Sequence, residues 1–391
     1  MKRAVALVLG LGLAATACTG TGHDTLRIGA IYPLTGSQGP GGVDEHRGVM
    51  LAAELANADA ASPDRIELVS IDVTGPDGAP EAIRRLAGDG IDLVLGSYGS
   101  TISAAAAPAA AERGLLFWET GAVGMLPGES LPGDRTFQVP PTGALLGTNA
   151  IAFVADRLAD RLHRDPADLR YAVSFVDDAY GRSVARGALD ELRARHLRVA
   201  SRIPYDFRTL DADAVAREIA HARTDVLFVS AYLQDAIALR QALLQRHVPL
   251  VASIGTSSSY CMPEFGQTLG HDAVGLFASD KPAAAPLNTA GLTRDAAALL
   301  ARANAAYRER WGGDMSAPAL AGFSAARGID LPSGSLPNGS GLHFGAPGTP
   351  DAGDNLAAAS VIWEWVTPGH AEVVWPPAFA TYPISPMDIS S

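Results

Sequence analysis

The chain has 391 residues, of which 48% are hydrophobic and 18% are charged, so it is long enough for two domains and too apolar to be disordered. Its formal net charge is -12, and no sustained cluster of Lys and Arg is present. Nucleic-acid binding needs a basic face that neutralises phosphates, so these features exclude a nucleic-acid partner.

The N-terminus resembles a bacterial lipoprotein signal peptide. Lys2 and Arg3 precede an apolar run, Ala4–Ala15, which is shorter than the roughly 20 residues of a membrane-spanning helix. The run ends in the sequence ATAC, which resembles a lipobox except that Ala15 stands where Leu is usual. We expect residues 1–17 to be removed, Cys18 to be acylated, and 18–25 to form a tether on the outer face of the cytoplasmic membrane. The alternative is simple secretion after cleavage nearby, with Cys18 incidental.

Cysteine usage fits an exported chain without a disulfide. Cys18 and Cys261 are the two cysteines, and acylation of Cys18 would leave Cys261 alone. Residues so far apart give no metal-binding spacing. We expect Cys261 to be a half-buried structural residue.

The first part of the chain alternates between strand and helix patterns. The predicted strands are Leu26–Tyr32, Ile66–Ile71, Leu93–Leu95 and Leu115–Trp118. The predicted helices are about Val43–Ala58, Ala79–Leu86 and about Thr101–Arg113, the last with a local conflict at Pro108.

A second series begins after Pro140-Pro141. Its predicted helices are Leu145–His163, Arg182–Arg195, Ala212–His221 and Asp235–Gln245, and its predicted strands are Tyr171–Phe175, Val199–Ile203, Val226–Val229 and Leu250–Ser253. This alternation predicts two α/β lobes whose parallel sheets are covered on both faces. Ligands of open α/β sheets bind beyond the carboxyl ends of the strands. The loops to examine therefore follow Tyr32, Leu95, Trp118, Phe175, Val229 and Ser253.

Five stretches of sequence carry a family resemblance. They read LRIGAIYPLTGSQGPGGVDEHRGVMLAAELAN from residue 26, IDLVLGSYGSTIS from 91, VSFVDDAYGRSVARG from 173, RANAAYRERWGGDMSAPALAGFSAAR from 302 and DAGDNLAAASVIWEWV from 351. In content and order they resemble the leucine/isoleucine/valine-type periplasmic binding proteins of ABC transporters. The resemblance implies two Rossmann-like lobes with parallel sheets, joined by a three-crossing hinge that closes on a ligand in the cleft. Lobe I would comprise 26–140 plus about 280–335, and lobe II 141–279 plus about 340–380.

The resemblance also implies ligand contacts in lobe I. Ser100 and Thr101 match a hydroxyl pair that holds the ligand's carboxylate at a helix N-terminus. An ordinary helix N-cap is the alternative. Gly121, Ala122 and Val123 match a second contact segment, in which Gly121 keeps the carbonyl that accepts from an ammonium, whereas Val123 lacks the usual hydroxyl.

In lobe II, Tyr180 and Tyr232 match tyrosines that close over the ligand, and packing within the lobe is the alternative. The loop IGTSSSY places Thr256, Ser257 and Ser258 where amino-acid-binding members often carry a glutamate for the ligand's ammonium. Three acids, Asp178, Glu119 and Asp235, are candidates to replace it. We favour a solvated turn or cap role for Asp178 and Asp235.

These features predict a substrate-binding lipoprotein of an ABC importer. Its partners would be the permease subunits and a small polar ligand, either a branched-chain amino acid or a related carboxylate or amide, and we expect a monomer. A ligand-sensing receptor or regulator of the same fold is the alternative. No G-x-S-x-G, P-loop or H-E-x-x-H motif is present, so we expect no catalytic residue, metal or cofactor.

The chain departs from the family after Arg327. The Gly/Pro/Ser-rich stretch that follows predicts loops and turns, so part of lobe I is expected to be pared down. LHFG, from residue 342, and ASVIWEWV, from residue 359, are expected to be the returning strands.

Overall fold

The computed structural model describes residues 25–60, 62, 64–124, 135–326, 331, 333–346, 348–387 and 389. The predicted signal peptide, Cys18 and the tether up to residue 24 lie outside the described residues. The described chain forms two compact units: unit 1 holds 25–122, 135–140 and 292–359, and unit 2 holds 123–124, 141–291 and 360–389, apart from the gaps just given. No described helix has the length and apolar character that crossing a membrane requires.

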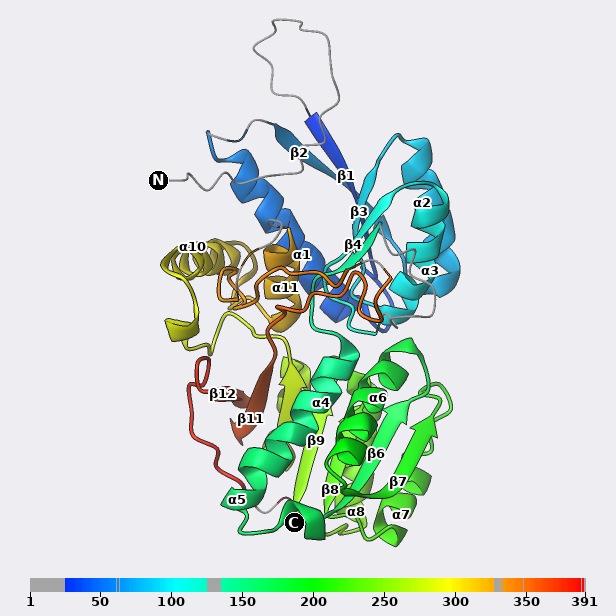
Figure 1. Cartoon of the computed structure of the whole chain (residues 1–391), viewed down its shortest axis with the longest axis vertical. Helices are drawn as coiled ribbons and strands as arrows, with labels where there is room; N and C mark the ends of the chain where they lie inside the picture. The colour runs from blue at the N-terminus through cyan, green and yellow to red at the C-terminus, as the bar shows by residue number, and fades with distance from the viewer. Residues whose placement is uncertain are drawn as a thin grey trace, which may run out of the picture. The chain divides into compact units, whose positions relative to one another are not determined.

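The sheet of unit 1 is parallel throughout, with strand order β2-β1-β3-β4-β5. The strands are β1 (Thr25–Tyr32), β2 (Arg65–Asp72), β3 (Leu93–Gly96), β4 (Leu116–Glu119) and β5 (Thr136–Gln138). The helices described in this unit are α1 (Gly39–Asn57), α2 (Ala79–Gly88), α3 (Ser100–Glu112), α10 (Arg294–Trp311) and α11 (Ala317–Ala325). Helices α2 and α3 pack together on one face of the sheet, and α1 and α11 pack together on the other (Figure 1).

The sheet of unit 2 is mixed, with strand order β12-β11-β10-β9-β8-β6-β7. Parallel pairing joins β6 (Arg170–Val176), β7 (Arg198–Tyr205), β8 (Val226–Ser230), β9 (Ala252–Thr256) and β10 (Phe277–Asp280). Antiparallel pairing then adds β11 (Val361–Thr367) and β12 (His370–Trp375). The helices are α4 (Gly143–Phe153), α5 (Ala159–Arg161), α6 (Ala179–Ala194), α7 (Ala212–His221), α8 (Leu233–Gln245) and α9 (Pro263–Leu269), and a π-helical turn, Val154–Leu158, joins α4 to α5.

Continuous apolar runs explain why the central strands are buried on both faces. In β1, Ala30, Ile31 and Tyr32 are fully buried, and all five residues of β8 are buried. Parallel strands covered by helices on both faces need such runs rather than an alternating pattern. Because the strands are parallel, their carboxyl ends meet at one edge of each sheet. In unit 1 the register pairs Ile31 with Gly96 and Leu95 with Trp118, so the loops that follow these strands are neighbours.

Glycines let one helix pair in each unit approach closely. A side chain at Gly48 of α1 would overlap the carbonyl of Ala319 in α11. In the same way, a side chain at Gly147 of α4 or at Gly187 of α6 would overlap backbone atoms of the other helix. Figure 1 shows both pairs, α1 with α11 and α4 with α6. Small residues at the crossing therefore set how closely these helices cover their sheets.

The predicted α/β class and the strand-helix alternation are confirmed, whereas several element boundaries differ from the predicted ones. Helix α1 begins at Gly39 rather than Val43, because Pro40 suits its first turn and Gly41 packs against the ring of Tyr98. Strand β9 runs to Thr256, beyond the predicted end at Ser253. Helix α3 continues through Pro108, where the sequence predicted a local conflict.

The segment after the predicted break follows a different course from the one expected. Residues 340–359 belong to unit 1, whereas the sequence grouped about 340–380 with lobe II, and 281–291 belong to unit 2. Leu336 and Leu342 are buried against Val139 and Ala325, so the described part of this segment completes the core of unit 1. LHFG forms isolated bridges rather than a strand, whereas ASVIWEWV does contain β11. The Asn355 side-chain amide donates to the carbonyls of Val139 and Gly341, so it ties this irregular segment to the chain that follows β5.

Candidate ligand-binding site

Ser100 lies at the start of α3, directly beyond the carboxyl end of β3. The residue is 5% exposed, and Thr101 is half-buried. The N-cap position is held by Gly99, and no side chain caps this helix. The alternative interpretation of Ser100 and Thr101 as an ordinary N-cap pair is therefore wrong. The Ser97 hydroxyl instead donates to the Gly99 carbonyl at 3.0 Å, which fixes the loop before the helix.

Glu119, at the end of β4, ties the two predicted contact loops of unit 1 together. One carboxylate oxygen accepts from the backbone N–H groups of Gly121 and Ala122, at 2.8 and 2.7 Å. The other accepts from the N–H of Ser97 at 2.7 Å and from the hydroxyl of Ser103. Burial raises the pKa of Glu119 to about 7, against the lowering effect of these donors. Because both oxygens are engaged by protein donors, Glu119 organises the loops rather than offering a charge to an ammonium.

A second buried acid, Glu45 of α1, lies beneath the same loop. The hydroxyl of Thr120 donates to Glu45 Oε1 at 2.6 Å, and the hydroxyl of Tyr32 lies 2.8 Å from the Thr120 hydroxyl. A side chain at Gly121 would overlap the Glu45 carboxylate, so only glycine permits this approach. Ala122 and Val123 are also buried, and the Val123 carbonyl accepts from the N–H of Gly143. The sequence did not identify Glu45, since a charged residue in an amphipathic helix normally indicates an exposed position.

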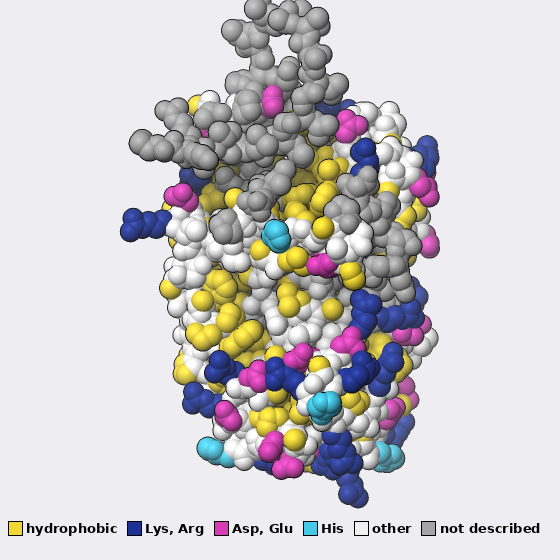
Figure 2. Space-filling view, in the orientation of Figure 1, with side chains coloured by type: hydrophobic (Ala, Val, Ile, Leu, Met, Phe, Trp, Pro, Cys, Tyr) yellow, Lys and Arg dark blue, Asp and Glu magenta, His cyan; other side chains and the backbone are white. Residues whose placement is uncertain are grey.

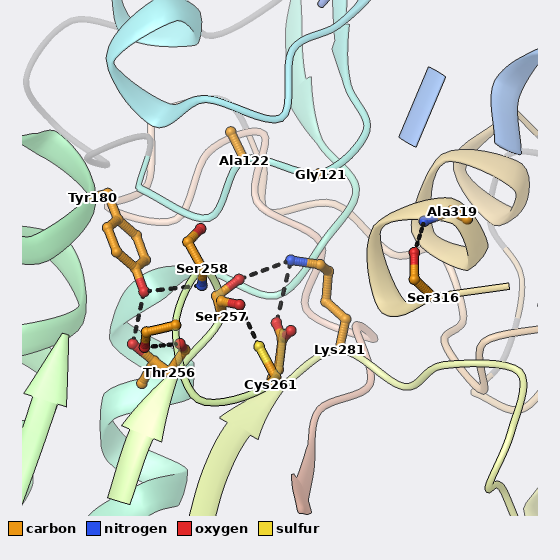
Figure 3. Close-up of polar contacts among 12 residues, drawn as sticks. Gly121, Ala122, Tyr180, Thr256, Ser257, Ser258, Cys261, Lys281, Ser316 and Ala319 are labelled. Atoms are coloured by element: carbon orange, nitrogen blue, oxygen red, sulfur yellow. Dashed lines mark hydrogen bonds and ion pairs between the residues drawn. The ribbon is translucent and has the colours of Figure 1, made fainter. Parts of the chain in front are cut away.

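Tyr180 and Tyr232 lie together at the carboxyl ends of the strands of unit 2. Their ring centroids are 5.5 Å apart, and Phe207 packs edge-on against Tyr232 at 5.2 Å. The Tyr180 hydroxyl lies 2.8 Å from the Thr256 hydroxyl and accepts from the N–H of Ser258 (Figure 3). Burial raises the pKa of Tyr180 above its ordinary value, so it stays a neutral hydroxyl. The structure thus places these tyrosines beside the loop that contains Ser257.

Asp178 is a helix cap, as expected, whereas Asp235 is not, and both carboxylates are held by tyrosine hydroxyls. Asp178 caps α6 by accepting from the N–H of Gly181 at 2.9 Å, and it accepts from the Tyr232 hydroxyl at 2.6 Å. Asp235 is buried in the first turn of α8 and accepts from the Tyr205 hydroxyl at 2.5 Å. Burial raises the pKa of both carboxyls, that of Asp235 to about 6. Solvated roles were predicted because the tyrosines that bond these acids lie far from them in the sequence or outside any local pattern: Tyr205 ends β7, and Tyr232 precedes α8.

A charged side chain that the sequence analysis missed contacts the loop of Ser257. Lys281 directly follows β10 and is 1% exposed. Its ammonium donates to the Ser257 hydroxyl at 3.1 Å and lies 3.3 Å from a carboxylate oxygen of Asp280 (Figure 3). The Cys261 thiol donates to the Ser257 carbonyl, so Cys261 is a half-buried structural residue, as predicted. The sequence did contain a signal for this residue, because Lys2 and Lys281 are the two lysines among 30 Lys and Arg residues.

The predicted contacts therefore gather in two sets, each within its own unit. In unit 1, Glu119 connects the loop of Ser100 to Gly121 and Ala122. In unit 2, Tyr180, Tyr232 and Ser257 lie around the ends of β6, β8 and β9. No group of three or more His, Cys, Asp or Glu side chains in the described ranges has the geometry to hold a metal ion. On the face drawn in Figure 2, basic and acidic side chains are interspersed.

Comparison with known proteins agrees with this arrangement. The Leu/Ile/Val-binding protein homolog 8 of Brucella suis biovar 1 is 27% identical over 359 residues, which cover 86% of this chain and 88% of the relative. The fold resembles the leucine-binding protein LivK of Thermotoga maritima, with a TM-score of 0.73, 16% identity, and coverage of 89% of this chain and 97% of that protein. It also resembles an ABC transporter solute-binding protein of R. palustris in complex with benzoate, with a TM-score of 0.72, 15% identity, and coverage of 92% and 98%.

The two units, each an α/β sheet covered by helices, define a type I periplasmic binding fold. The family model for periplasmic binding proteins matches residues 25–329, and the chain belongs to that family. This confirms the resemblance found in the sequence. The family consists of extracytoplasmic ligand-binding proteins rather than enzymes.

Proposed function

We propose that this protein is the substrate-binding lipoprotein of an ABC importer and delivers a small carboxylate- or amide-containing ligand to permease subunits. Its mature form is a monomer held on the outer face of the cytoplasmic membrane by an acylated Cys18. The relative from Brucella suis, named for leucine, isoleucine and valine binding, and the resemblance to LivK support the transport role.

The observation that carries the proposal is the organisation of the contact loops at the carboxyl ends of the strands. In unit 1, Ser100 and Thr101 begin α3, and Gly121 and Ala122 follow β4, whereas Val123, the next residue, belongs to unit 2. Unit 2 contributes the paired rings of Tyr180 and Tyr232 and the hydroxyl of Ser257. Hydroxyl and N–H donors at a helix start favour a carboxylate, and aromatic faces favour an apolar body. The donors of unit 1 thus suit the polar end of a small molecule, and the rings of unit 2 suit an apolar body.

Mass spectrometry of small molecules released by denaturing the purified protein tests this function. We expect one enriched organic acid, amide or amino acid in stoichiometric amount, and calorimetric titration of that compound into refolded protein should show micromolar or tighter affinity. A protein that releases no small molecule, and that binds no amino acid, amide or organic acid in titration, would contradict the proposal.

A further inference from the structure

Lys281 is unusual both in its chemistry and in its position. A buried ammonium is costly unless it is paired and hydrogen-bonded, and this chain uses arginine for nearly all of its other basic positions. Lys281 nevertheless places its ammonium in the loop that follows β9, in contact with the Ser257 hydroxyl and the Asp280 carboxylate. This is the loop in which the sequence lacks the acid expected of an amino-acid-binding member. A cation has therefore been placed where an anion was expected.

The charged groups around Ser257 do not replace the missing glutamate. Asp280 is fully buried, and its carboxylate forms an ion pair with the adjacent ammonium of Lys281 at 3.3 Å. The lysine touches the Ser257 hydroxyl directly, whereas no hydrogen bond joins Asp280 to the Ser257 side chain among the described residues. Burial, with a further contribution from Asp280, raises the pKa of Cys261 well above its ordinary value, so its thiol stays neutral. A ligand group bound to the Ser257 hydroxyl would therefore lie next to the ammonium of Lys281.

The hydrogen bond from Lys281 also orients the Ser257 hydroxyl. Because Ser257 Oγ accepts from Lys281 at 3.1 Å, its own hydrogen is oriented to donate away from the lysine. A ligand ammonium bound to the same oxygen would lie about 4–5 Å from the lysine ammonium, a separation at which like charges repel in a partly buried site. A carboxylate or carbonyl oxygen would accept the serine hydrogen and be attracted to the lysine.

We infer that Lys281 is a specificity-determining residue that selects, at the Ser257 loop, for a carboxylate or other acceptor and against an α-ammonium. The ligand class is then an organic acid without an α-amino group. This inference rests on the proposed function, and it narrows the ligand rather than changing the site.

Matched ligand pairs that differ only in the α-ammonium test the inference. The pairs are 4-methylpentanoate with L-leucine, and 3-phenylpropanoate with L-phenylalanine, each titrated calorimetrically into the full-length protein. We expect the acid of each pair that binds to have at least a tenfold lower Kd than its amino acid. Equal affinities, or a preference for the amino acid, would overturn the inference and leave the transport function standing. If neither pair binds, the ligand released on denaturation decides: an α-amino acid overturns the inference, an acid without that group supports it, and a protein without any ligand contradicts both proposals.

Two variants assign the preference to the lysine. Replacing Lys281 alone would leave Asp280 as a buried, unpaired charge that destabilises the fold. The double substitution Asp280→Asn with Lys281→Met removes both charges, and we expect it to reduce the preference for the acid to about twofold or less. Lys281→Arg, which keeps the charge, should retain a preference of tenfold or more. A double variant that folds and keeps the wild-type preference would show that Lys281 does not set it.

Discussion

Ser100 illustrates how a residue can be placed by sequence while its role depends on the structure. Ser100 is the first residue of helix α3, just beyond the carboxyl end of β3, and the strand-helix pattern predicts this position. The structure adds that Gly99, not Ser100, holds the N-cap position, so helix capping does not account for this serine. Ligand binding stays as its proposed role.

Ser100→Ala should therefore weaken binding much more than folding. A hydrogen bond to a charged ligand group contributes about 1.5–3 kcal/mol, so we expect roughly a ten- to hundredfold rise in Kd with little change in Tm. Calorimetric titration with the ligand released on denaturation, together with thermal unfolding, measures both. Ser103→Ala is the matched control, because the Ser103 hydroxyl donates to buried Glu119 and its loss should lower Tm. A lowered Tm with unchanged Kd in Ser100→Ala would return this serine to a structural role.

The residues that sequence reasoning missed share a physical feature. Glu45, Asp280 and Lys281 are charged side chains in buried positions, and their partners come from elements distant in the chain or from the turn beside them. Local patterns assign charge to the surface, because burying an unpaired charge is unfavourable. Only the tertiary structure shows the compensating partner. Tyr180 and Tyr232 were singled out by the family resemblance, which needs no knowledge of buried partners, and their contact with a ligand stays a prediction.

Elements were predictable where hydrophobic period and turn residues agreed. The central strands β1, β6 and β8 are apolar runs bounded by polar turns, and they lie where the sequence placed them. Helix α1 was predicted too short because glycines normally disfavour helix. At Gly41 and Gly42, close packing against Tyr98 and Pro33 offsets that preference. The segment beyond residue 330 could not be placed, since its core contacts with Val139 and Ala325 are set by the fold and not by a local pattern.

The crossing of α1 with α11 makes an element-scale prediction. Gly48→Ala should destabilise unit 1, because the added methyl group would overlap the backbone of Ala319 and force the helices apart. Overpacking of this kind typically costs about 1–3 kcal/mol. Urea unfolding followed by circular dichroism measures the change.

Gly88→Ala is the control for that substitution. Gly88 is the exposed last residue of α2, with nothing within reach of an added side chain. Since alanine favours helix over glycine by up to about 1 kcal/mol, this variant should be as stable as the wild type or slightly more stable. Similar stabilities for Gly48→Ala and Gly88→Ala would show that the helix crossing adapts to the extra methyl group.

At the scale of the whole molecule, the first prediction concerns the proposed membrane anchor. The sequence before Thr25 supports the proposal that acylated Cys18 anchors the mature protein. Cells grown with a fatty-acid probe should label the wild-type protein and not Cys18→Ser, and the variant should appear in the soluble extracytoplasmic fraction. Cys261→Ser, which alters the other cysteine, should keep the label. Equal labelling of wild type and Cys18→Ser would exclude the anchor.

The pH dependence of stability is also a property of the whole molecule, because buried acids occur in both units. Burial raises the pKa of Glu119 and of Glu364 to about 7, and that of Asp235 to about 6. In the unfolded chain these groups ionise near their ordinary pKa of about 4. Between those values the folded protein binds more protons than the unfolded chain, so the free energy of unfolding falls as the pH rises. We expect these acids to lower stability progressively from about pH 4 to pH 7.

Glu364 of β11 gives the sharpest test, because it is 1% exposed and its Oε2 accepts from the N–H of Ser385 at 3.0 Å. Glu364→Gln keeps an acceptor for that bond but removes the titration. The variant should match the wild type near pH 4 and exceed it at pH 8, by up to about 3 kcal/mol for a shift of this size. Asp225→Asn is the control of opposite sign: paired Arg170 lowers the pKa of Asp225, so this variant should lose stability at pH 8 and less in acid. Urea unfolding at several pH values measures the slopes, and an unchanged slope in Glu364→Gln would show that this carboxyl is ionised in the folded protein throughout.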